Sequence, residues 1–279
     1  MQTVAIVGVG LIGGSFALAL KKAGFKGRIL GVSSERSVRE ALTRGAIDEA
    51  ATLSHAAAHA DLIYLSQPVS RIIETIAQLE DLVKPEALVT DAGSTKAAIH
   101  AAAARHLTRC RFLGGHPMAG KEKRGVSEAD PFLFTGRTYV LTPGSPEDLE
   151  GDLVHELVEW VLRIGATPFI LPPDEHDALV AFTSHLPQLV STALASTVAA
   201  RLDSPDRIAV AGSGLNDMTR LAASAYDIWR DIIDTNTDAI DAALAAYIAR
   251  LETIRASLRS SDLESEFGQG ADFASHLKR

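Results

Sequence analysis

The sequence predicts an α/β fold, a doubly wound and mainly parallel sheet with helices on both faces, followed by an all-α domain. Short runs of β-forming residues alternate with helix-period stretches up to about residue 171, and this pattern is typical of parallel sheets. Two adjacent prolines, Pro172 and Pro173, then interrupt the chain, and hardly any strand signal follows them. The 279 residues exceed the usual size of a single core, which favours two domains, 1–171 and 172–279.

The chain opens with a strand that runs into a glycine turn. The apolar run Thr3–Val7 precedes three glycines in the register G-x-G-x-x-G and then an apolar helix. Such a turn lets a pyrophosphate approach the backbone at the positive end of a helix dipole. We therefore expect a Rossmann-type domain that binds a dinucleotide, and an ordinary tight turn is the alternative. The residues expected to contact the cofactor here are Gly8, Gly10, Leu11, Ile12 and Gly13.

The remaining elements of this domain follow from β-propensity and from helix-period apolar residues. Strands are expected at Arg28–Ser33, Asp61–Ser66, Ala87–Asp91, Arg111–Gly115, Thr138–Thr142 and Thr167–Leu171. Helices are expected at Leu11–Ala23, Glu35–Arg44, Val69–Leu82, Lys96–His106 and Pro146–Ile164, several of them opened by serine or proline.

The second domain is expected to be helical and to form a homodimer. Its two long alanine-rich stretches, Asp177–Arg201 and Asn236–Arg259, have more apolar surface than an isolated helix can hide. A bundle sealed within one chain is the alternative. The polar tail Ser260–Arg279 is expected to be loosely held.

Charge and cysteine content disfavour several classes of function. The net charge of −8, from 27 Lys and Arg against 35 Asp and Glu, disfavours nucleic-acid binding, which depends on neutralising phosphates. Cys110 is the only cysteine, which excludes an internal disulfide and a cysteine-rich zinc site; we expect it to be buried, and we expect no metal site. The first strand begins almost at Met1, and no uninterrupted apolar run approaches membrane-spanning length. We therefore expect a cytoplasmic protein without a signal peptide or a membrane partner.

Polar side chains follow the fourth and fifth predicted strands, where ligands of open parallel sheets bind. Ser94 comes after the fourth strand and His116 after the fifth. An imidazole near its unperturbed pKa works as a base near neutral pH, so His116 is the candidate that takes a proton from a substrate hydroxyl while a hydride leaves the same carbon. A turn histidine before Pro117, and a serine that caps the helix beginning near Lys96, are the alternatives.

Two more candidates lie in the second half. His185 stands at an otherwise apolar helix entrance, where a satisfied core histidine is the commoner finding. Arg220 stands among small and apolar residues, and its guanidinium can bind a carboxylate with two parallel hydrogen bonds. An ion pair of Arg220 with Asp217 or Asp227 is the alternative.

The residue at the end of the second strand usually determines whether a dinucleotide fold prefers NAD or NADP. An acidic residue there accepts hydrogen bonds from the ribose 2′-hydroxyl and repels a 2′-phosphate. This chain has Ser33, followed by Ser34, Glu35 and Arg36. Hydroxyls and a guanidinium favour NADP, while Glu35 keeps NAD open. A cap on the following helix is the alternative reading of Ser34.

Together these segments resemble the prephenate and arogenate dehydrogenase family of tyrosine biosynthesis. The resemblance rests, in order along nearly the whole chain, on residues 8–15, 91–96, 114–120, 184–188, 219–222 and 228–232. The segments His-Pro-Met-Ala-Gly and Ser-His-Leu-Pro are the most distinctive. The resemblance implies a Rossmann domain, a helical dimerisation domain, and NAD(P)-dependent oxidative decarboxylation of prephenate to 4-hydroxyphenylpyruvate or of arogenate to tyrosine.

The resemblance also implies roles for the candidates. His116 would hold and deprotonate the ring hydroxyl, with Ser94 hydrogen-bonded to His116 or to that hydroxyl. Arg220 would bind a substrate carboxylate, and His185 would contact the polar side chain of the substrate. Many relatives carry a second basic residue where this chain has Asn216, so one carboxylate contact is in doubt.

The sequence does not decide between prephenate and arogenate, and two other classes of protein are alternatives. Prephenate and arogenate differ only in a keto or an amino group, and Gln188 is the candidate that distinguishes them. A β-hydroxyacid dehydrogenase or imine reductase also joins a Rossmann domain to helices, and a noncatalytic nucleotide-sensing regulator would keep the same fold. The two histidines together with Arg220 favour the dehydrogenase.

Overall fold

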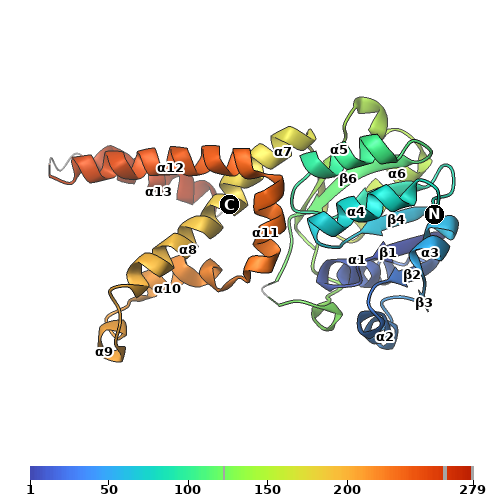
Figure 1. Cartoon of the computed structure of the whole chain (residues 1–279), viewed down its shortest axis with the longest axis horizontal. Coiled ribbons are helices and arrows are strands. Elements are labelled where there is room, and N and C mark those ends of the chain that lie inside the picture. Colours follow the sequence, from blue (N-terminus) through green and yellow to red (C-terminus); the bar gives the residue numbers. More distant parts are fainter. Residues whose placement is uncertain (122, 260–262, 278–279) are drawn as a thin grey trace. The chain divides into compact units, whose positions relative to one another are not determined.

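A computed structural model describes residues 1–121, 123–259 and 263–277 of the chain, which folds as two compact units (Figure 1). The first unit comprises Met1–Val180 together with Ala223–Asn236. The second unit comprises Ala181–Ala222 together with Thr237–Arg279. The assignment of two domains at 1–171 and 172–279 stays a prediction.

The first unit is built on a sheet with the strand order β3-β2-β1-β4-β5-β6-β7-β8. All neighbouring strands are parallel except β6 and β7, so the prediction of a mainly parallel sheet is confirmed. The strands are β1 Thr3–Val7, β2 Arg28–Val32, β3 Glu49–Ala50, β4 Leu62–Leu65, β5 Leu88–Asp91, β6 Arg111–Pro117, β7 Thr138–Thr142 and β8 Thr167–Ile170.

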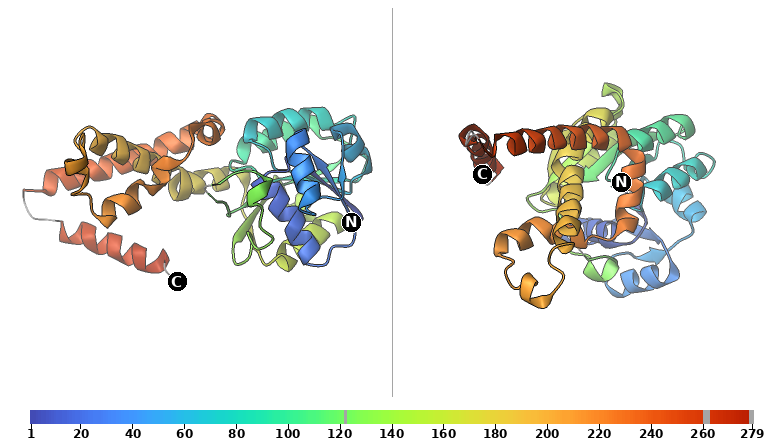
Figure 2. Two further views of the ribbon diagram at one scale, coloured as in Figure 1. Left: turned by 90° about the horizontal axis from the view of Figure 1, so that it is seen from below. Right: turned by 60° about the vertical axis from the view of Figure 1, so that its left-hand side comes forward.

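Helices cover both faces of this sheet (Figure 2). Side chains alternate along β1, so Val4 and Ile6 pack against α1, α2 and α6, whereas Ala5 and Val7 pack with α3, α4 and α5. The helices are α1 Leu11–Lys22, α2 Glu35–Thr43, α3 Leu53–His59, α4 Val69–Leu79, α5 Ala97–His106, α6 Asp152–Arg163, α7 Pro173–Val180 and α11 Tyr226–Thr235. The doubly wound arrangement is therefore confirmed.

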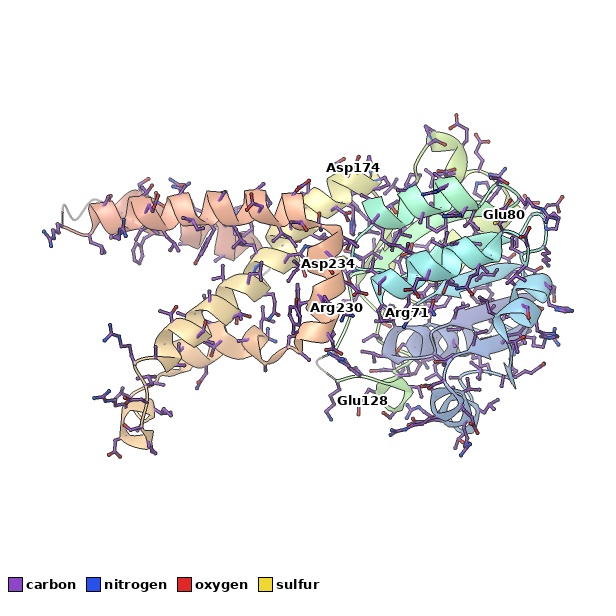
Figure 3. The ribbon with its side chains drawn as sticks, in the orientation of Figure 1. Arg71, Glu80, Glu128, Asp174, Arg230 and Asp234 are labelled. Carbon is purple, nitrogen blue, oxygen red and sulfur yellow. The ribbon has the colours of Figure 1, made fainter. Side chains whose placement is uncertain are left out.

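Helix α4 shows why these helices form where they do. Its buried side chains, among them Ile72 and Ile76, recur at helical spacing on one face. Arg71 lies on the exposed face, where it pairs with Glu74 at 2.6 Å (Figure 3). The apolar face therefore packs on the sheet while the charged face stays in water.

The structure corrects the prediction of one helix over Pro146–Ile164. A short 3-10 turn at Pro146–Leu149 comes first, and Gly151, with a φ of 103°, separates it from α6. This left-handed backbone suits glycine and interrupts the helix. The sequence prediction also missed β3 and α3, which are too short to show a clear period.

The described residues of the second unit form helices and no strand, as predicted. A π-helical turn, Ala181–His185, separates α7 from α8 and divides the helix predicted over Asp177–Arg201. Helix α12 matches the predicted stretch Asn236–Arg259, and α13 lies within the tail Ser260–Arg279, of which residues 260–262 and 278–279 are outside the described part. The helices are α8 Leu186–Ala199, α9 Pro205–Ile208, α10 Ser213–Thr219, α12 Thr237–Ser257 and α13 Glu264–Leu277.

Two further sequence expectations change in detail. Cys110 is half-buried rather than fully buried, and this partial burial raises the pKa of its thiol to about 11. The helical stretch Pro173–Ala199 is long and apolar enough, by length and composition alone, to cross a membrane, although no such run was expected. Core helices of water-soluble proteins pass the same test, so this single stretch is weak support for a membrane span.

Candidate active site

The glycine turn between β1 and α1 has the geometry of a phosphate site. Gly8 has a φ of 96°, and a Cβ there would lie 2.8 Å from atoms of Ser66 and Gln67. A Cβ on Gly13 would lie 2.3 Å from Ser66 Oγ, so α1 packs closely on the strands. No described atom lies within 4 Å of a Cβ built on Gly10. The three glycines thus serve the turn, close ligand approach and helix packing, as a dinucleotide requires.

The N-terminus of α1 is ready to accept an anion. Gly10 is the N-cap, and within the described chain no side chain caps this end or adds an acidic residue to its first turn. The N–H groups and the positive end of the helix dipole therefore face the turn without competing carboxylates. The residues present fit the pyrophosphate of a dinucleotide.

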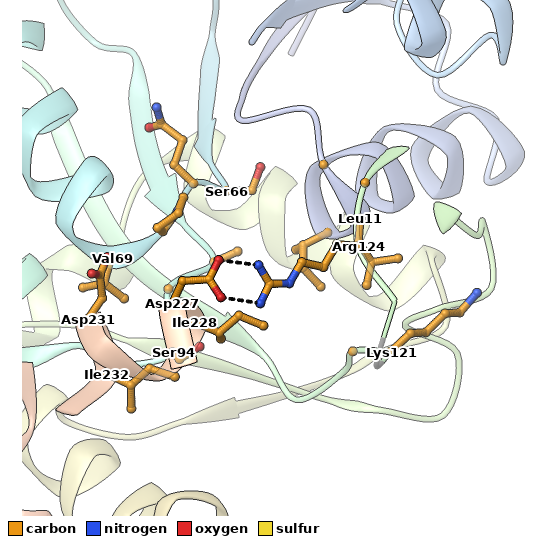
Figure 4. Close-up of a pocket in the computed structure, with 18 of the residues that line it drawn as sticks. Leu11, Ser66, Val69, Ser94, Lys121, Arg124, Asp227, Ile228, Asp231 and Ile232 are labelled. Atoms are coloured by element: carbon orange, nitrogen blue, oxygen red, sulfur yellow. Dashed lines mark hydrogen bonds and ion pairs between the residues drawn. The ribbon is translucent and has the colours of Figure 1, made fainter. Parts of the chain in front are cut away.

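A pocket of about 440 Å³ opens beside this turn (Figure 4). It lies where the strand order reverses, because β2 is on one side of β1 and β4 on the other. Ligands of open α/β sheets bind at such a point. Gly10, Leu11, Ile12 and Ser94 of the predicted site line the pocket. The segment Ser66–Val69 after β4, the loop after β6 and helix α11 complete the lining.

An ion pair lies on the wall of this pocket. Arg124 Nη1 donates to Asp227 Oδ2 at 2.6 Å and Nη2 donates to Oδ1 at 2.8 Å (Figure 4). The hydrogen bond from Arg124 lowers the pKa of Asp227 and raises that of the guanidinium. Asp227, considered above as a partner of Arg220, therefore pairs with Arg124. Both side chains are largely exposed, so the pair adds little to stability.

Asp231 fixes the helix that carries this wall. Its Oδ2 accepts hydrogen bonds from Ser70 N at 3.0 Å and from Ser70 Oγ at 2.6 Å, which ties α11 to the start of α4. Burial acts to raise the pKa of Asp231, but the hydrogen bonds from Ser70, together with the nearby charge of Arg230, outweigh it and the pKa is lowered. The neighbouring Arg230, on the same helix, lies 3.5 Å from Asp231 Oδ1 (Figure 3).

His116 belongs to a row of three side chains. Its Nδ1 lies 2.8 Å from His176 Nε2, and His176 Nδ1 lies 2.8 Å from Asp177 Oδ1. His176 and Asp177 are buried, and His116 is half-buried near the carboxyl end of β6. The Asp177 carboxylate also accepts hydrogen bonds from the backbone N–H groups of Lys96, at 2.7 Å, and Ala97, at 2.8 Å. One carboxylate thus holds both α5 and the histidine row.

These contacts correct the alternative reading of Ser94 as a helix cap. Helix α5 begins after Lys96, and Asp177 accepts its first N–H groups. Ser94 instead lines the pocket beside the glycine turn. Its expected hydrogen bond to His116 or to a substrate hydroxyl stays a prediction.

A buried ion pair fixes the backbone beside His116. Lys96 and Asp91 are in contact with 0% of either side chain exposed, and Lys96 Nζ also donates to Gly115 O at 2.6 Å. Asp91 accepts hydrogen bonds from Gly93 N at 2.7 Å and from Gly115 N at 3.2 Å. Burial lowers the pKa of Lys96, against the opposing effect of the Asp91 charge. The ends of β5 and β6 are thereby held together just before His116.

The residues expected to select the cofactor follow β2. Ser33 directly succeeds this strand, and Ser34 is the N-cap of α2, accepting a backbone N–H from the first turn at 3.3 Å. The capping reading of Ser34 is therefore confirmed. Glu35 pairs with Arg39 at 2.6 Å, and Arg36 is exposed on the first turn. Cofactor contacts by Ser33, Ser34 and Arg36 stay predictions.

The second unit brings together two of the predicted substrate segments. His185 is buried at the end of the π-helical turn, and Gln188 follows in the first turn of α8. Gln188 Nε2 donates to Leu221 O at 2.9 Å, next to Arg220, whose side chain is exposed. The structure thus joins α8 to the segment of Arg220. Substrate contacts by these residues stay predictions.

The sequence prediction missed two groups of side chains in this region. Arg124 and Asp227 are 103 residues apart, and nothing local signals their pairing. His176 and Asp177 belong to the polar run 174–177 after the two prolines, and nothing in that run sets them apart from a solvated helix start. Among the described residues no group of three or more His, Cys, Asp or Glu side chains could hold a metal ion.

Comparison with known proteins identifies the family of this chain. The chain matches the model for the prephenate dehydrogenase nucleotide-binding domain over residues 16–167 and that for the prephenate dehydrogenase dimerization domain over residues 172–278. It is 35% identical, over 274 residues, to a prephenate dehydrogenase of Bacillus subtilis (strain 168), covering 95% of this chain and 72% of that protein.

Solved structures agree with this result. Prephenate dehydrogenase from A. aeolicus, in complex with hydroxyphenyl propionate and NAD+, has a TM-score of 0.88 at 31% identity, over 100% of this chain and 99% of that one. Synechocystis arogenate dehydrogenase has a TM-score of 0.82 at 30% identity, over 99% and 98% of the two chains. The chain therefore belongs to the prephenate dehydrogenase family, as the sequence resemblance predicted.

Proposed function

We propose that this oxidoreductase oxidatively decarboxylates prephenate to 4-hydroxyphenylpyruvate, or arogenate to tyrosine, with NADP as the preferred cofactor. The observation that carries the proposal is the position of His116. It lies near the carboxyl end of β6, in a row with His176 and Asp177, in the sheet whose glycine turn fits a dinucleotide. An oriented base and a dinucleotide site are what hydride removal from a hydroxyl-bearing carbon requires.

His116 acts as the base in this reaction. A hydride leaves the ring carbon that bears the hydroxyl, and the hydroxyl proton goes to His116. The ring carboxylate then leaves as CO2, its bonding electrons make the ring aromatic, and the phenolate oxygen takes the proton back from His116. A bound nicotinamide supplies the hydride acceptor. Ser94, on the pocket wall, donates a hydrogen bond to His116 or to the reacting hydroxyl. The formation of the aromatic ring makes the reaction effectively irreversible.

The second unit supplies the substrate contacts in this proposal. Arg220 binds a substrate carboxylate through paired hydrogen bonds, and His185 contacts the polar side chain of the substrate. Gln188 distinguishes a keto from an amino group, because its amide is oriented by the hydrogen bond to Leu221 O. Many relatives have a second basic residue at the position of Asn216, so in this proposal the chain lacks that second contact with a substrate carboxylate.

The preference for NADP is supported by the residues after β2. Ser33 and Ser34 stand where NAD enzymes carry an acid, and Arg36 is exposed nearby to meet a 2′-phosphate. Glu35 is already paired with Arg39. The A. aeolicus relative was crystallised with NAD+, so NAD is the alternative cofactor. We expect Arg36→Ala to raise KM for NADP+ far more than KM for NAD+, and equal effects would remove the assignment.

A cytoplasmic homodimer formed through the second unit completes the proposal. The matched family model for residues 172–278 is described as a dimerization domain. Large apolar side chains of this unit, including Phe267 and Phe273, are exposed in the single chain. Their burial against a second copy would remove apolar surface from water.

Steady-state rates with each combination of prephenate or arogenate and NAD+ or NADP+ test the function. We expect reduced cofactor to form with at least one of the two substrates, and faster with NADP+. His116→Asn should lower kcat by roughly 10²- to 10⁴-fold while cofactor still binds, because the base is lost. Unchanged turnover in this variant would remove the catalytic role of His116, and no turnover of either substrate by the wild type would overturn the function.

A further inference from the structure

The row His116, His176, Asp177 fixes the hydrogen positions on two imidazoles. A carboxylate accepts hydrogen bonds, so the contact of 2.8 Å between Asp177 Oδ1 and His176 Nδ1 places a hydrogen on that nitrogen. A neutral imidazole carries one N–H, so His176 Nε2 is then an acceptor. His116 Nδ1, 2.8 Å away, must donate to it. In a neutral His116 this is the only ring hydrogen, so Nε2 carries none, as a base requires.

Asp177 is itself held with its carboxylate facing hydrogen-bond donors. Its carboxylate accepts the backbone N–H groups of Lys96 and Ala97 at the start of α5, in addition to His176. Its backbone carbonyl accepts Asn236 Nδ2 at 2.9 Å. Each carboxylate contact is with a donor, so the oxygen facing His176 acts as an acceptor. Burial of His176, at 0% exposure, keeps water from offering another partner.

We propose that His176 and Asp177 are positioning residues that hold His116 in the tautomer with its hydrogen on Nδ1. The inference rests on the proposed function, in which Nε2 of His116 takes the hydroxyl proton. In that step the substrate O–H bond breaks and an N–H bond forms at Nε2. The resulting imidazolium still donates its Nδ1–H to His176 Nε2, and His176 still donates to Asp177. Orientation of a base by a third group is a recurrent catalytic arrangement.

Three variants separate positioning from a structural role. His176→Phe keeps the ring shape but removes the acceptor, so we expect kcat to fall roughly 10²-fold or more, with KM for substrate and cofactor nearly unchanged. His176→Gln offers an acceptor oxygen to His116, and we expect its kcat to stay within about tenfold of wild type. The matched control is His100→Gln on α5, a half-buried histidine that contacts Thr142 Oγ1 at 3.1 Å and should leave kcat unchanged.

A spectroscopic test needs no substrate. The full-length protein with ¹⁵N-labelled histidine is studied by NMR at neutral pH, and signals are assigned by their loss in His116→Asn and His176→Gln. We expect His116 and His176 each to carry a single hydrogen, on Nδ1. In His176→Phe, His116 should shift towards the tautomer with the hydrogen on Nε2, which neutral imidazoles otherwise favour.

The outcomes distinguish this inference from the proposed function. A wild-type His116 with its hydrogen on Nε2, or a His176 with both nitrogens protonated, would overturn the inference. So would a folded His176→Phe protein with the kcat of the His100→Gln control. If His176→Phe does not fold, the wild-type spectrum and His176→Gln still decide. A wild type that oxidises neither substrate overturns the proposed function, while the nitrogen spectra still decide the tautomer.

Discussion

The two units bury their apolar side chains to very different degrees. Both core clusters lie in the first unit, on the two faces of its sheet. In the described part of the second unit the buried residues are Ala181, His185, Gln188, Ser191, Ile240 and Ala243, of which half are polar. Phe267 is 75% exposed and Phe273 is 65% exposed. The first unit therefore has a complete core within one chain, whereas the second needs another surface, in accord with the proposed homodimer.

Truncating a core side chain of the first unit should have the largest effect on stability. Phe16 is fully buried and stacks on Tyr64 with ring centroids 4.1 Å apart, so Phe16→Ala should lower the free energy of unfolding by about 3–5 kcal/mol. Both tryptophans, Trp160 and Trp229, lie in this unit, so their fluorescence during urea denaturation measures the change. An unchanged urea midpoint would show that Phe16 contributes little to the stability of the first unit.

A charge on an exposed phenylalanine of the second unit should weaken the dimer. If Phe273 is buried against a second copy, Phe273→Glu removes about 1.5–3 kcal/mol of apolar burial and raises the dimer Kd by at least about tenfold. Analytical ultracentrifugation over a range of concentrations measures this Kd. Phe132→Glu is the matched control, since Phe132 is 57% exposed in the first unit and its loss should leave the dimer intact. Equal changes of the dimer Kd in the two variants would contradict the proposal that the second unit, and not the first, forms the dimer.

Acid should weaken the first unit through Asp231. Its pKa lies below the ordinary value of 3.8, so its stabilisation is fully present above that value and is lost as pH falls through the lowered folded-state pKa. Asp231→Asn should cost about 1–3 kcal/mol at neutral pH, because the hydrogen bonds from Ser70 lose their charged acceptor. The variant should also lose part of the acid dependence that we expect in urea denaturation as pH falls below about 4. A parallel pH dependence in both proteins would count against the assignment.

Removing a surface ion pair of the second unit should have the smallest effect. Arg250 Nη1 lies 2.6 Å from Glu266, and the arginine side chain is 55% exposed. Glu266→Gln should therefore change the free energy of unfolding by about 0.2–1 kcal/mol, and less in high salt. Thermal melts at low and high salt measure it. A larger loss of stability would indicate that this ion pair is buried in an interface. The second unit would then be more buried than the single chain suggests.

The sequence predicted the parts of the molecule that depend on local patterns. The glycine turn depends only on a strand, three glycines and a helix that follow one another in the sequence. The structure has the turn at the predicted residues. Strand ends then bring Ser94 to the same pocket as Gly10, because parallel strands finish on one edge. Propensity alone placed most helices and strands to within a few residues.

Contacts between distant segments were beyond sequence reasoning. Asp177 caps a helix that begins 80 residues earlier, and no local pattern announces such a cap. Helix α11 packs in the first unit although segments of the second unit flank it in the chain. Gly151 interrupted a stretch whose apolar period looked continuous, because a single left-handed residue outweighs the period. These three misses involve a tertiary partner or one backbone angle rather than composition.

The shared role of Asp177 constrains how this enzyme can change over generations. The same carboxylate starts α5 and faces His176, so we expect a substitution there to lower folding yield and turnover together. Lineages exploring new substrates should keep this position and vary Gln188 or Asn216 instead. A laboratory library built for altered substrate range should leave residue 177 unmutated and place its diversity in the second unit.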